Sequence, residues 1–229
     1  MARRISRKEM KHDEFVETAV EAGHWLEENW PMVVKGAIAL AVLAAVIGFV
    51  FWQLARSRDQ AEELLARGIG LYQQAETTGF ALAGDLEAAL ALFEESAGKT
   101  GSGAAGQSAR YYQGASLLQL GRADEAVDVL EALSAESLPP TLASSTQVLF
   151  AEALASGGQI ERAIEQLQTV ADTPDSIYPP EQALLRLAQV YADEGEAEQA
   201  REVLRRITQQ YPQSAAAMEA NSRLGSARE

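Results

Sequence analysis

Hydrophobic residues in this chain follow a continuous pattern near the N-terminus and a periodic pattern afterwards. The seventeen residues from Gly36 to Trp52 carry no charge, and the longer apolar stretch runs from Trp30 to Leu54. The steps from Trp30 to Trp52 rise roughly 33 Å as a helix, close to the about 30 Å of a bilayer's hydrocarbon core. A soluble helix of this length rarely lacks a polar face. The pattern therefore predicts a single transmembrane helix at residues 31–55.

After residue 58 the hydrophobic pattern repeats with a period of 37 residues. Each repeat combines a glycine, an alanine five positions later and a large apolar residue four positions further on. A period between about 20 and 50 residues is typical of arrays built from one supersecondary unit. The columns of equivalent residues are Gly84, Gly121, Gly158 and Gly195; Ala89, Ala126, Ala163 and Ala200; and Phe93, Leu130, Leu167 and Leu204.

The last copy shows how one repeat is expected to form two antiparallel helices. Apolar residues at helical spacing predict a first helix that ends at Gly195, because glycine commonly follows the end of a helix. A second helix follows and stops before Pro212, which cannot continue it. Small residues, Ala188 in the first helix and Ala200 in the second, allow the two backbones to approach closely. Gly114 with Ala126 repeats this pairing in the second copy.

This arrangement resembles the tetratricopeptide repeat, whose pattern is W-x2-L-G-x2-Y, then A-x3-F, then P. The last copy matches this pattern with Leu187-Ala188-x2-Tyr191, Ala200-x3-Leu204 and Pro212. The resemblance implies an all-α fold. We expect a single N-terminal transmembrane helix followed by a tetratricopeptide-like α-solenoid of about four helical hairpins.

The first copy and the two ends of the array depart from the regular pattern. In the first copy we predict a helix at residues 59–76 and a longer turn before Gly84. Residues 99–107, with the sequence KTGSGAAGQ, predict a flexible turn between the first and second copies. Residues 215–224 predict a closing helix that covers the last apolar face, as a solenoid requires.

Basic residues are distributed unequally about the apolar segment. Six precede its uncharged core and three follow it: Arg3, Arg4, Arg7, Lys8, Lys11 and Lys35 before, and Arg56, Arg58 and Arg67 after. Because the cytoplasmic flank of a membrane helix carries the excess of Lys and Arg, residues 1–30 are predicted to be cytoplasmic, with a short amphipathic helix at residues 13–30. Residues 56–229 then form an exported repeat domain. A cleaved signal peptide fits less well, because the stretch before the apolar segment is too long.

Small residues recur four positions apart within the apolar segment, at Ala37, Ala41 and Ala45. Residues of this kind let two helices approach closely in a membrane. An alanine-rich segment also produces this spacing by accident. Helix–helix association through these alanines is therefore one of two interpretations.

Charge separates the two parts of the chain. Residues 1–58 carry a net charge of +1 and residues 59–229 a net charge of −15. A surface this acidic repels phosphate backbones, which argues against nucleic acid as a partner. The acidic residues either attract basic protein segments or simply keep the domain soluble.

Side chains for common catalytic or metal chemistry are scarce. The chain has no cysteine, and both histidines, His12 and His24, precede the apolar segment. Without these side chains the usual nucleophile–base pairs and zinc sites cannot be assembled in the repeats. We therefore predict no enzymatic activity, no cofactor and no metal site.

Partner-binding residues are expected on the concave face of the solenoid, on the side of each first helix that faces away from its hairpin partner. Tyr111, Val148 and Leu185 occupy equivalent positions 37 residues apart. They form either an apolar stripe for a peptide or ordinary packing, and both interpretations stay open. The full set of candidates is Tyr111, Leu118, Val148, Glu152, Leu185, Gln189 and Asp193.

The layout of the whole chain resembles a bacterial protein family. An acidic stretch leads into WLEENW at residues 25–30, a span ending in Phe51-Trp52 follows, and a repeat domain completes the chain. This order is similar to the ancillary SecYEG translocon subunit family. The resemblance implies a single-pass protein of the bacterial inner membrane whose periplasmic repeats contact translocon subunits, exported proteins or periplasmic chaperones.

Two other functions are compatible with the same layout. The repeats suit an envelope-assembly or cell-division coordinator that binds its partners in the periplasm. They also suit an accessory subunit that covers a membrane enzyme. The resemblance assigns no functional residue to a position in this chain, so it does not choose among specific partners.

Overall fold

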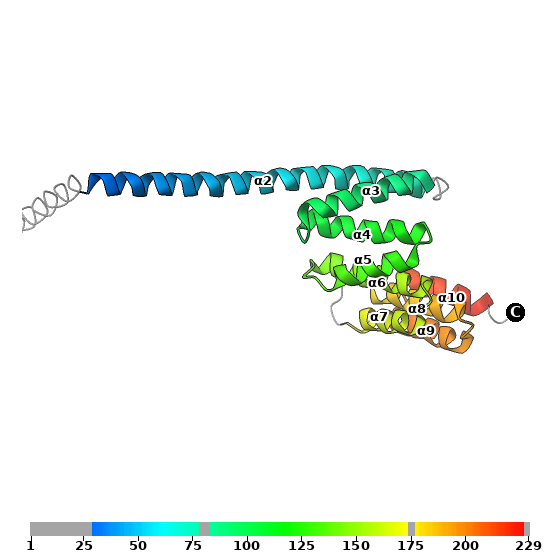
Figure 1. Cartoon of the computed structure of the whole chain (residues 1–229). Helices are drawn as coiled ribbons and strands as arrows, with labels where there is room; N and C mark the ends of the chain where they lie inside the picture. The colour runs from blue at the N-terminus through cyan, green and yellow to red at the C-terminus, as the bar shows by residue number, and fades with distance from the viewer. Residues whose placement is uncertain (1–28, 78–82, 174–176, 227–229) are drawn as a thin grey trace, which may run out of the picture. The chain divides into compact units, whose positions relative to one another are not determined.

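The computed structural model describes residues 29–77, 83–173 and 177–226. Within these residues every regular element is an α-helix, which confirms the all-α prediction (Figure 1). The chain divides into two compact units, residues 1–56 and 57–229. The amphipathic helix expected at residues 13–30 falls almost entirely outside the described residues.

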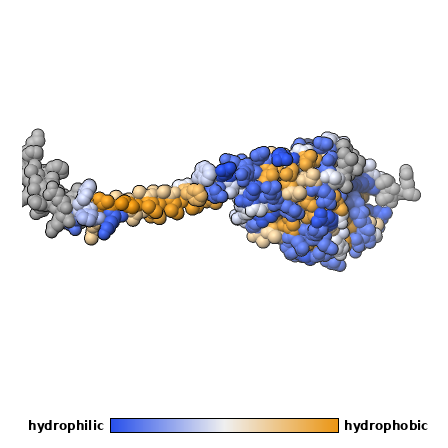
Figure 2. Space-filling view, turned by 45° about the horizontal axis from the view of Figure 1, so that its top comes forward, coloured by the Kyte–Doolittle hydropathy of each residue, from blue (hydrophilic) through white to orange (hydrophobic). Residues whose placement is uncertain are grey.

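The described part of the first unit is the beginning of helix α2, Trp30–Thr77. This is a helix long and apolar enough to cross a membrane, and its most hydrophobic stretch buries nothing within the protein. Its apolar side chains are exposed and form a continuous hydrophobic surface, as Figure 2 shows. Near the end of this hydrophobic stretch, the Arg56 guanidinium lies 5.5 Å from the centre of the Trp52 ring. An aromatic ring beside a basic group is typical of a bilayer–water interface.

Helix α2 corrects the prediction of two separate helices at residues 31–55 and 59–76. It runs without a break from Trp30 to Thr77. The intervening residues 53–58, QLARSR, contain neither glycine nor proline, and nothing in them ends a helix. Continuation of the helix keeps every backbone hydrogen bond, so the apolar span and the first repeat helix share one element.

Within the described residues, the second unit contains the end of α2 and eight further helices. Consecutive helices pack against one another as antiparallel hairpins, and the last helix packs on the two before it (Figure 1). The closing helix expected at residues 215–224 is present as α10. The helices are α3, Ala83–Thr100; α4, Ala104–Gln119; α5, Ala123–Ser134; α6, Pro140–Ser156; α7, Ile160–Asp172; α8, Pro180–Asp193; α9, Ala197–Gln210; and α10, Ala215–Ser226.

Glycines of the repeating column end three of the helices. Gly121, Gly158 and Gly195 have φ values of 73°, 75° and 78°, a left-handed conformation that favours glycine. At the second of these turns the amide of Gln159 donates a hydrogen bond of 2.8 Å to the Leu154 carbonyl, which closes the helix end. Gly84 lies inside α3 and ends no helix. The first copy therefore has a glycine at the expected spacing, but this glycine does not end a helix.

Two glycines allow close approach within the first two hairpins. A Cβ atom added to Gly68 would lie 2.6 Å from Cε1 of Phe93, and one added to Gly114 would lie 2.6 Å from Cγ of Leu130. Non-bonded carbon atoms do not approach this closely, so a larger residue at either position would force the facing side chain to shift. Gly114 was expected to face Ala126; its tightest contacts are with Leu130, one helical turn further along α5.

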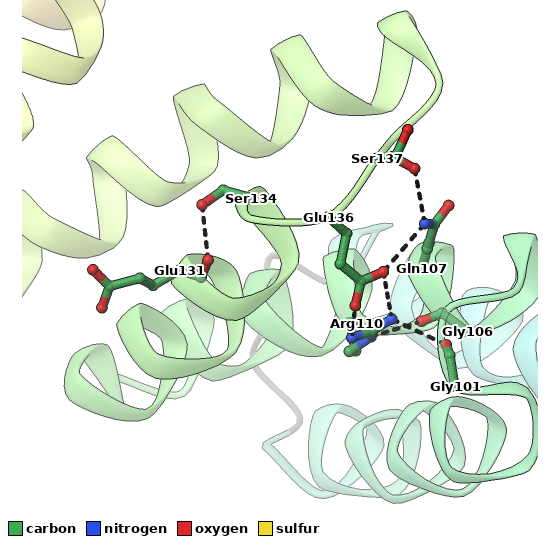
Figure 3. Close-up of polar contacts among 8 residues, drawn as sticks. All are labelled: Gly101, Gly106, Gln107, Arg110, Glu131, Ser134, Glu136 and Ser137. Atoms are coloured by element: carbon green, nitrogen blue, oxygen red, sulfur yellow. Dashed lines mark hydrogen bonds and ion pairs between the residues drawn. The ribbon is translucent and has the colours of Figure 1, made fainter.

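The flexible turn predicted at residues 99–107 is wrong in most of its length. Helix α3 continues to Thr100 and α4 begins at Ala104, so only residues 101–103 connect them. The Arg110 guanidinium donates to the Gly101 carbonyl at 3.0 Å and forms a forked pair with Glu136, at 2.5 and 3.1 Å (Figure 3). Buried Gln107 donates at 3.2 Å to the same carboxylate. These contacts fix the turn.

Candidate partner-binding groove

The first helices of three successive hairpins, α2, α4 and α6, enclose a hollow of about 400 Å³. Because tyrosine rings make up much of its wall, we call it the tyrosine groove. Tyrosine suits such a surface, since its ring offers apolar contact and its hydroxyl a hydrogen bond. The groove is lined by Tyr72, Tyr111, Tyr112, Ala115, Leu118, Gln119, Leu149, Glu152 and Ser156.

Packing on neighbouring aromatic rings holds the tyrosine rings in place. The ring of Tyr112 stacks on Phe93 with centres 5.4 Å apart, and Phe93 in turn packs on Gly68. Tyr72 and Tyr111 meet Tyr112 edge-on, at 5.8 and 5.5 Å. Edge-to-face contacts at these distances are favourable. The groove is therefore formed before any partner arrives.

One carboxylate lies in the wall of the groove. The side chain of Glu152 is 33% exposed, and burial raises the pKa of this carboxyl group above its usual value. The positive charge of Arg186 acts in the opposite direction, because its Nε lies 3.0 Å from Oε1 of Glu152. Glu152 is thus a partly buried carboxyl group with one counterion inside the protein.

Burial is the main cause of the raised pKa values of Tyr72 and Tyr111, and neighbouring carboxylates add to it. Burial, followed by the charge of Glu76, raises the pKa of Tyr72 to about 12. Burial also raises the pKa of Tyr111, and Glu152 adds to the effect. A carboxylate that opposes ionisation of nearby phenols attracts a cation by the same potential.

A second hollow of about 390 Å³ adjoins the tyrosine groove and shares Tyr111 and Tyr112 with it. It lies between the N-terminal halves of α4 and α6. Its other lining residues are Ala104, Gln107, Ser108, Pro139, Thr141, Leu142 and Ser145. The two tyrosines therefore belong to the walls of both hollows.

Two stretches of the second unit match known family models. Residues 80–137 match one model of the tetratricopeptide repeat and residues 182–214 match another. These stretches are similar to tetratricopeptide repeats. They cover α3–α5 and α8–α9, and they confirm the repeat family that the sequence pattern indicated. The comparison with curated proteins and the comparison with solved structures give no match.

Tetratricopeptide repeats are modules for protein–protein interaction rather than for catalysis. The repeats therefore indicate a scaffold whose partners are proteins. No group of three or more acidic or histidine side chains in the described part of the chain is placed to hold a metal ion. The tyrosine groove offers aromatic faces, hydroxyl and amide groups and one carboxylate, which can bind a peptide.

The structure distributes the seven predicted binding residues over three places. Tyr111, Leu118 and Glu152 meet in the tyrosine groove. Val148 and Leu185 are 5% and 6% exposed and belong to the core that α6 to α10 form together, so they offer little surface to a partner. For these two residues, ordinary packing is the interpretation that agrees with their burial.

The remaining two predicted residues, Gln189 and Asp193, lie exposed on α8. The Gln189 amide donates to Asp193 at 2.8 Å and accepts from Arg223 of α10 at 2.8 Å. Gln189 lines a separate hollow of about 390 Å³ formed by α8, α9 and α10. Partner binding by the seven residues stays a prediction, and three of them now share one surface.

Six of the nine lining residues were not predicted from the sequence, and the aromatic ones among them are Tyr72 and Tyr112. Tyr72 lies in the first repeat helix, where the irregular spacing after Thr77 hid the register. Gly68 was the available signal, because it takes the place of the small residue at Gly114, Ala151 and Ala188. Tyr112 follows Tyr111 directly in the sequence. Because adjacent residues of a helix point in different directions, only Tyr111 was expected at the binding site.

Proposed function

We propose that this protein is a membrane-anchored scaffold at the bacterial inner membrane, an ancillary translocon or chaperone-like factor for exported proteins. The observation that carries the proposal is the combination of repeats and an apolar helix in one chain. Residues 80–137 and 182–214 are interaction repeats, and α2 begins with an exposed hydrophobic stretch of membrane-spanning length. An interaction surface on a membrane anchor acts on clients that pass that membrane.

The proposed topology places residues 1–30 in the cytoplasm, residues 31–55 in the membrane and residues 56–229 in the periplasm. The excess of basic residues before the span supports this orientation. The partners are then translocon subunits, exported proteins or periplasmic chaperones. Ala37, Ala41 and Ala45 are proposed to permit close contact with a membrane helix of such a partner.

Site-specific photo-crosslinking in native membranes tests this function. A photoreactive amino acid replaces Gln119, which lines the tyrosine groove, and in a matched control it replaces Gln209, which lies on α9 away from the groove. We expect position 119 to capture translocon subunits or exported chains and position 209 to capture them far less.

Other outcomes of the crosslinking experiment decide against the proposal in different ways. Cell-wall synthases or division proteins at position 119 would replace the translocon role with an envelope-assembly role. Subunits of one membrane enzyme would make the protein an accessory of that enzyme. Equal capture at positions 119 and 209 would show that the groove is not the binding surface.

A further inference from the structure

The tyrosine groove combines two features that apolar packing alone does not require. Three aromatic rings surround one hollow, and a poorly solvated carboxylate stands in its wall. The unit that contains them is strongly acidic, with a net charge of −15 over residues 59–229. Aromatic faces and a carboxylate both attract cations.

We propose that the tyrosine groove binds a basic side chain, arginine or lysine, presented by a segment of a partner protein. Glu152 accepts hydrogen bonds from the cationic group, and Tyr72, Tyr111 and Tyr112 pack around its aliphatic stem and charge. This inference rests on the proposed function as a protein-binding scaffold and adds the chemistry by which a partner segment is recognised.

The geometry of the rings suits a cation. A charged group is attracted to an aromatic face when it lies within about 6 Å of the ring centre. The ring centre of Tyr112 lies 5.8 Å from that of Tyr72 and 5.5 Å from that of Tyr111, so the three rings form one cluster in the wall of the hollow. Phe93 holds Tyr112 from below at 5.4 Å, which reduces the ordering cost of binding.

Arg186 shows that the carboxylate accepts a guanidinium group. Its Nε lies 3.0 Å from Oε1 of Glu152, the same side chain also forms a hydrogen bond with Tyr178, and it is 58% exposed on α8. Arg186 does not line the tyrosine groove. It therefore acts as an internal counterion, which an incoming basic side chain displaces or joins.

The direct test compares two capped peptides that differ in one charge. The probes are fluorescein-labelled Gly-Ser-Leu-Arg-Leu-Ser-Gly and the same peptide with citrulline in place of arginine, which keeps the shape and removes the charge. Binding to the full chain in non-ionic detergent is measured by fluorescence anisotropy at low and high salt. We expect the arginine peptide to bind at least about tenfold more tightly, the size of one charge-assisted hydrogen bond.

Two substitutions are expected to change this preference in opposite directions. Glu152→Gln should abolish the preference for the arginine peptide. Arg186→Ala should tighten its binding by about threefold, because the internal competitor is gone. The matched control is Asp172→Asn, which removes an equal charge from an exposed pair with Arg206, 2.6 Å long, outside the groove. It should leave the preference unchanged.

A stability measurement separates recognition from structure. Since burial raises the pKa of Glu152, its ionised form opposes folding at neutral pH, and Glu152→Gln should unfold at the same temperature as wild type or higher. Loss of binding together with a lower unfolding temperature would make Glu152 a structural residue and overturn the proposal.

Equal affinity for the arginine and citrulline peptides, or binding of neither, would also overturn this inference. Failure here is distinguishable from failure of the proposed function. If crosslinks at Gln119 persist while the peptides are not discriminated, the scaffold function stands and the cation site falls. If the arginine preference holds while the crosslinks capture only wall synthases, the cation site stands and the translocon role falls.

Discussion

Two glycines of α2, two positions apart, have opposite surroundings. A Cβ atom on Gly68 would collide with the Phe93 ring at 2.6 Å, whereas one on Gly70 would meet nothing within 4 Å. Gly68 therefore stays small because α3 is close, and Gly70 has no such constraint. The pair isolates the effect of packing from the intrinsic cost of glycine in a helix.

The substitution Gly68→Ala should lower the free energy of unfolding by about 1–3 kcal/mol, because the Phe93 ring must shift and the core becomes overpacked. Gly70→Ala, the matched control, should raise it by about 0.5–1 kcal/mol, since alanine loses less entropy in a helix. Urea unfolding of the full chain in detergent, followed by circular dichroism, measures both. Equal stability of the two variants would contradict the close approach of α2 and α3.

At the residue scale, sequence periodicity identified the core well. Ala89, Ala126, Ala163 and Ala200, the predicted column of small residues, are all buried. The groove was harder to predict, because Tyr72 and Tyr112 come from different helices and are brought together only by packing on Phe93. Spacing along one helix does not contain this information.

At the scale of elements, the turn between α3 and α4 shows why composition misled the prediction. Residues 99–107 are rich in glycine, serine and threonine, which indicates a flexible loop. The structure holds this turn through Arg110 and Gln107, whose common partner Glu136 lies 26 and 29 residues further along the chain. A contact between positions so far apart has no local pattern, so sequence reading missed it.

The same ion pair predicts a pH-dependent stability. Hydrogen bonding to Arg110 lowers the pKa of Glu136, against the opposing effect of burial. A carboxylate with a depressed pKa stabilises the fold above its unfolded value, about 4.3, and this contribution is lost as the pH falls through the folded value.

We therefore expect Glu136→Gln to cost about 1–2 kcal/mol at pH 7 and progressively less as the medium becomes more acidic. The control Glu95→Gln removes an exposed pair with Lys99, 3.5 Å long, and should cost at most about 0.5 kcal/mol. Denaturant unfolding at pH 7 and in acid compares the three proteins. If the stability lost in Glu136→Gln were independent of pH, the loss would come from the changed shape of the side chain rather than from its charge.

At the scale of the whole molecule, the sequence predicted the fold class because its signals are local and repeated. The apolar run and the 37-residue period each specify helices without reference to distant contacts. Partner identity is a property of two surfaces, and only one of them belongs to this chain. The order of helices could therefore be predicted, whereas a specific client could not.

The orientation of the apolar helix carries the last prediction. The excess of basic residues before the span should keep the N-terminus in the cytoplasm, so alkaline phosphatase fused after Glu229 should be active. Replacing Arg3, Arg4 and Arg7 by glutamine should reduce this activity, because the charge bias disappears. A fluorescent protein that matures only in the cytoplasm should stay dark at the same position, and fluorescence there would reverse the topology.

The separate cores of the array have a consequence for cooperativity. The cluster around Phe93 draws on α2, α3 and α4, and the cluster around Leu184 draws on α6 to α10. A third cluster around Leu130 draws on α3 to α7 and shares helices with both. Neighbouring units of a solenoid are coupled mainly at their shared boundaries, so such an array can open from one end in steps. A segment lying in the tyrosine groove touches α2, α4 and α6 together. Binding of such a segment would therefore couple these helices, and the two ends of the array would unfold together.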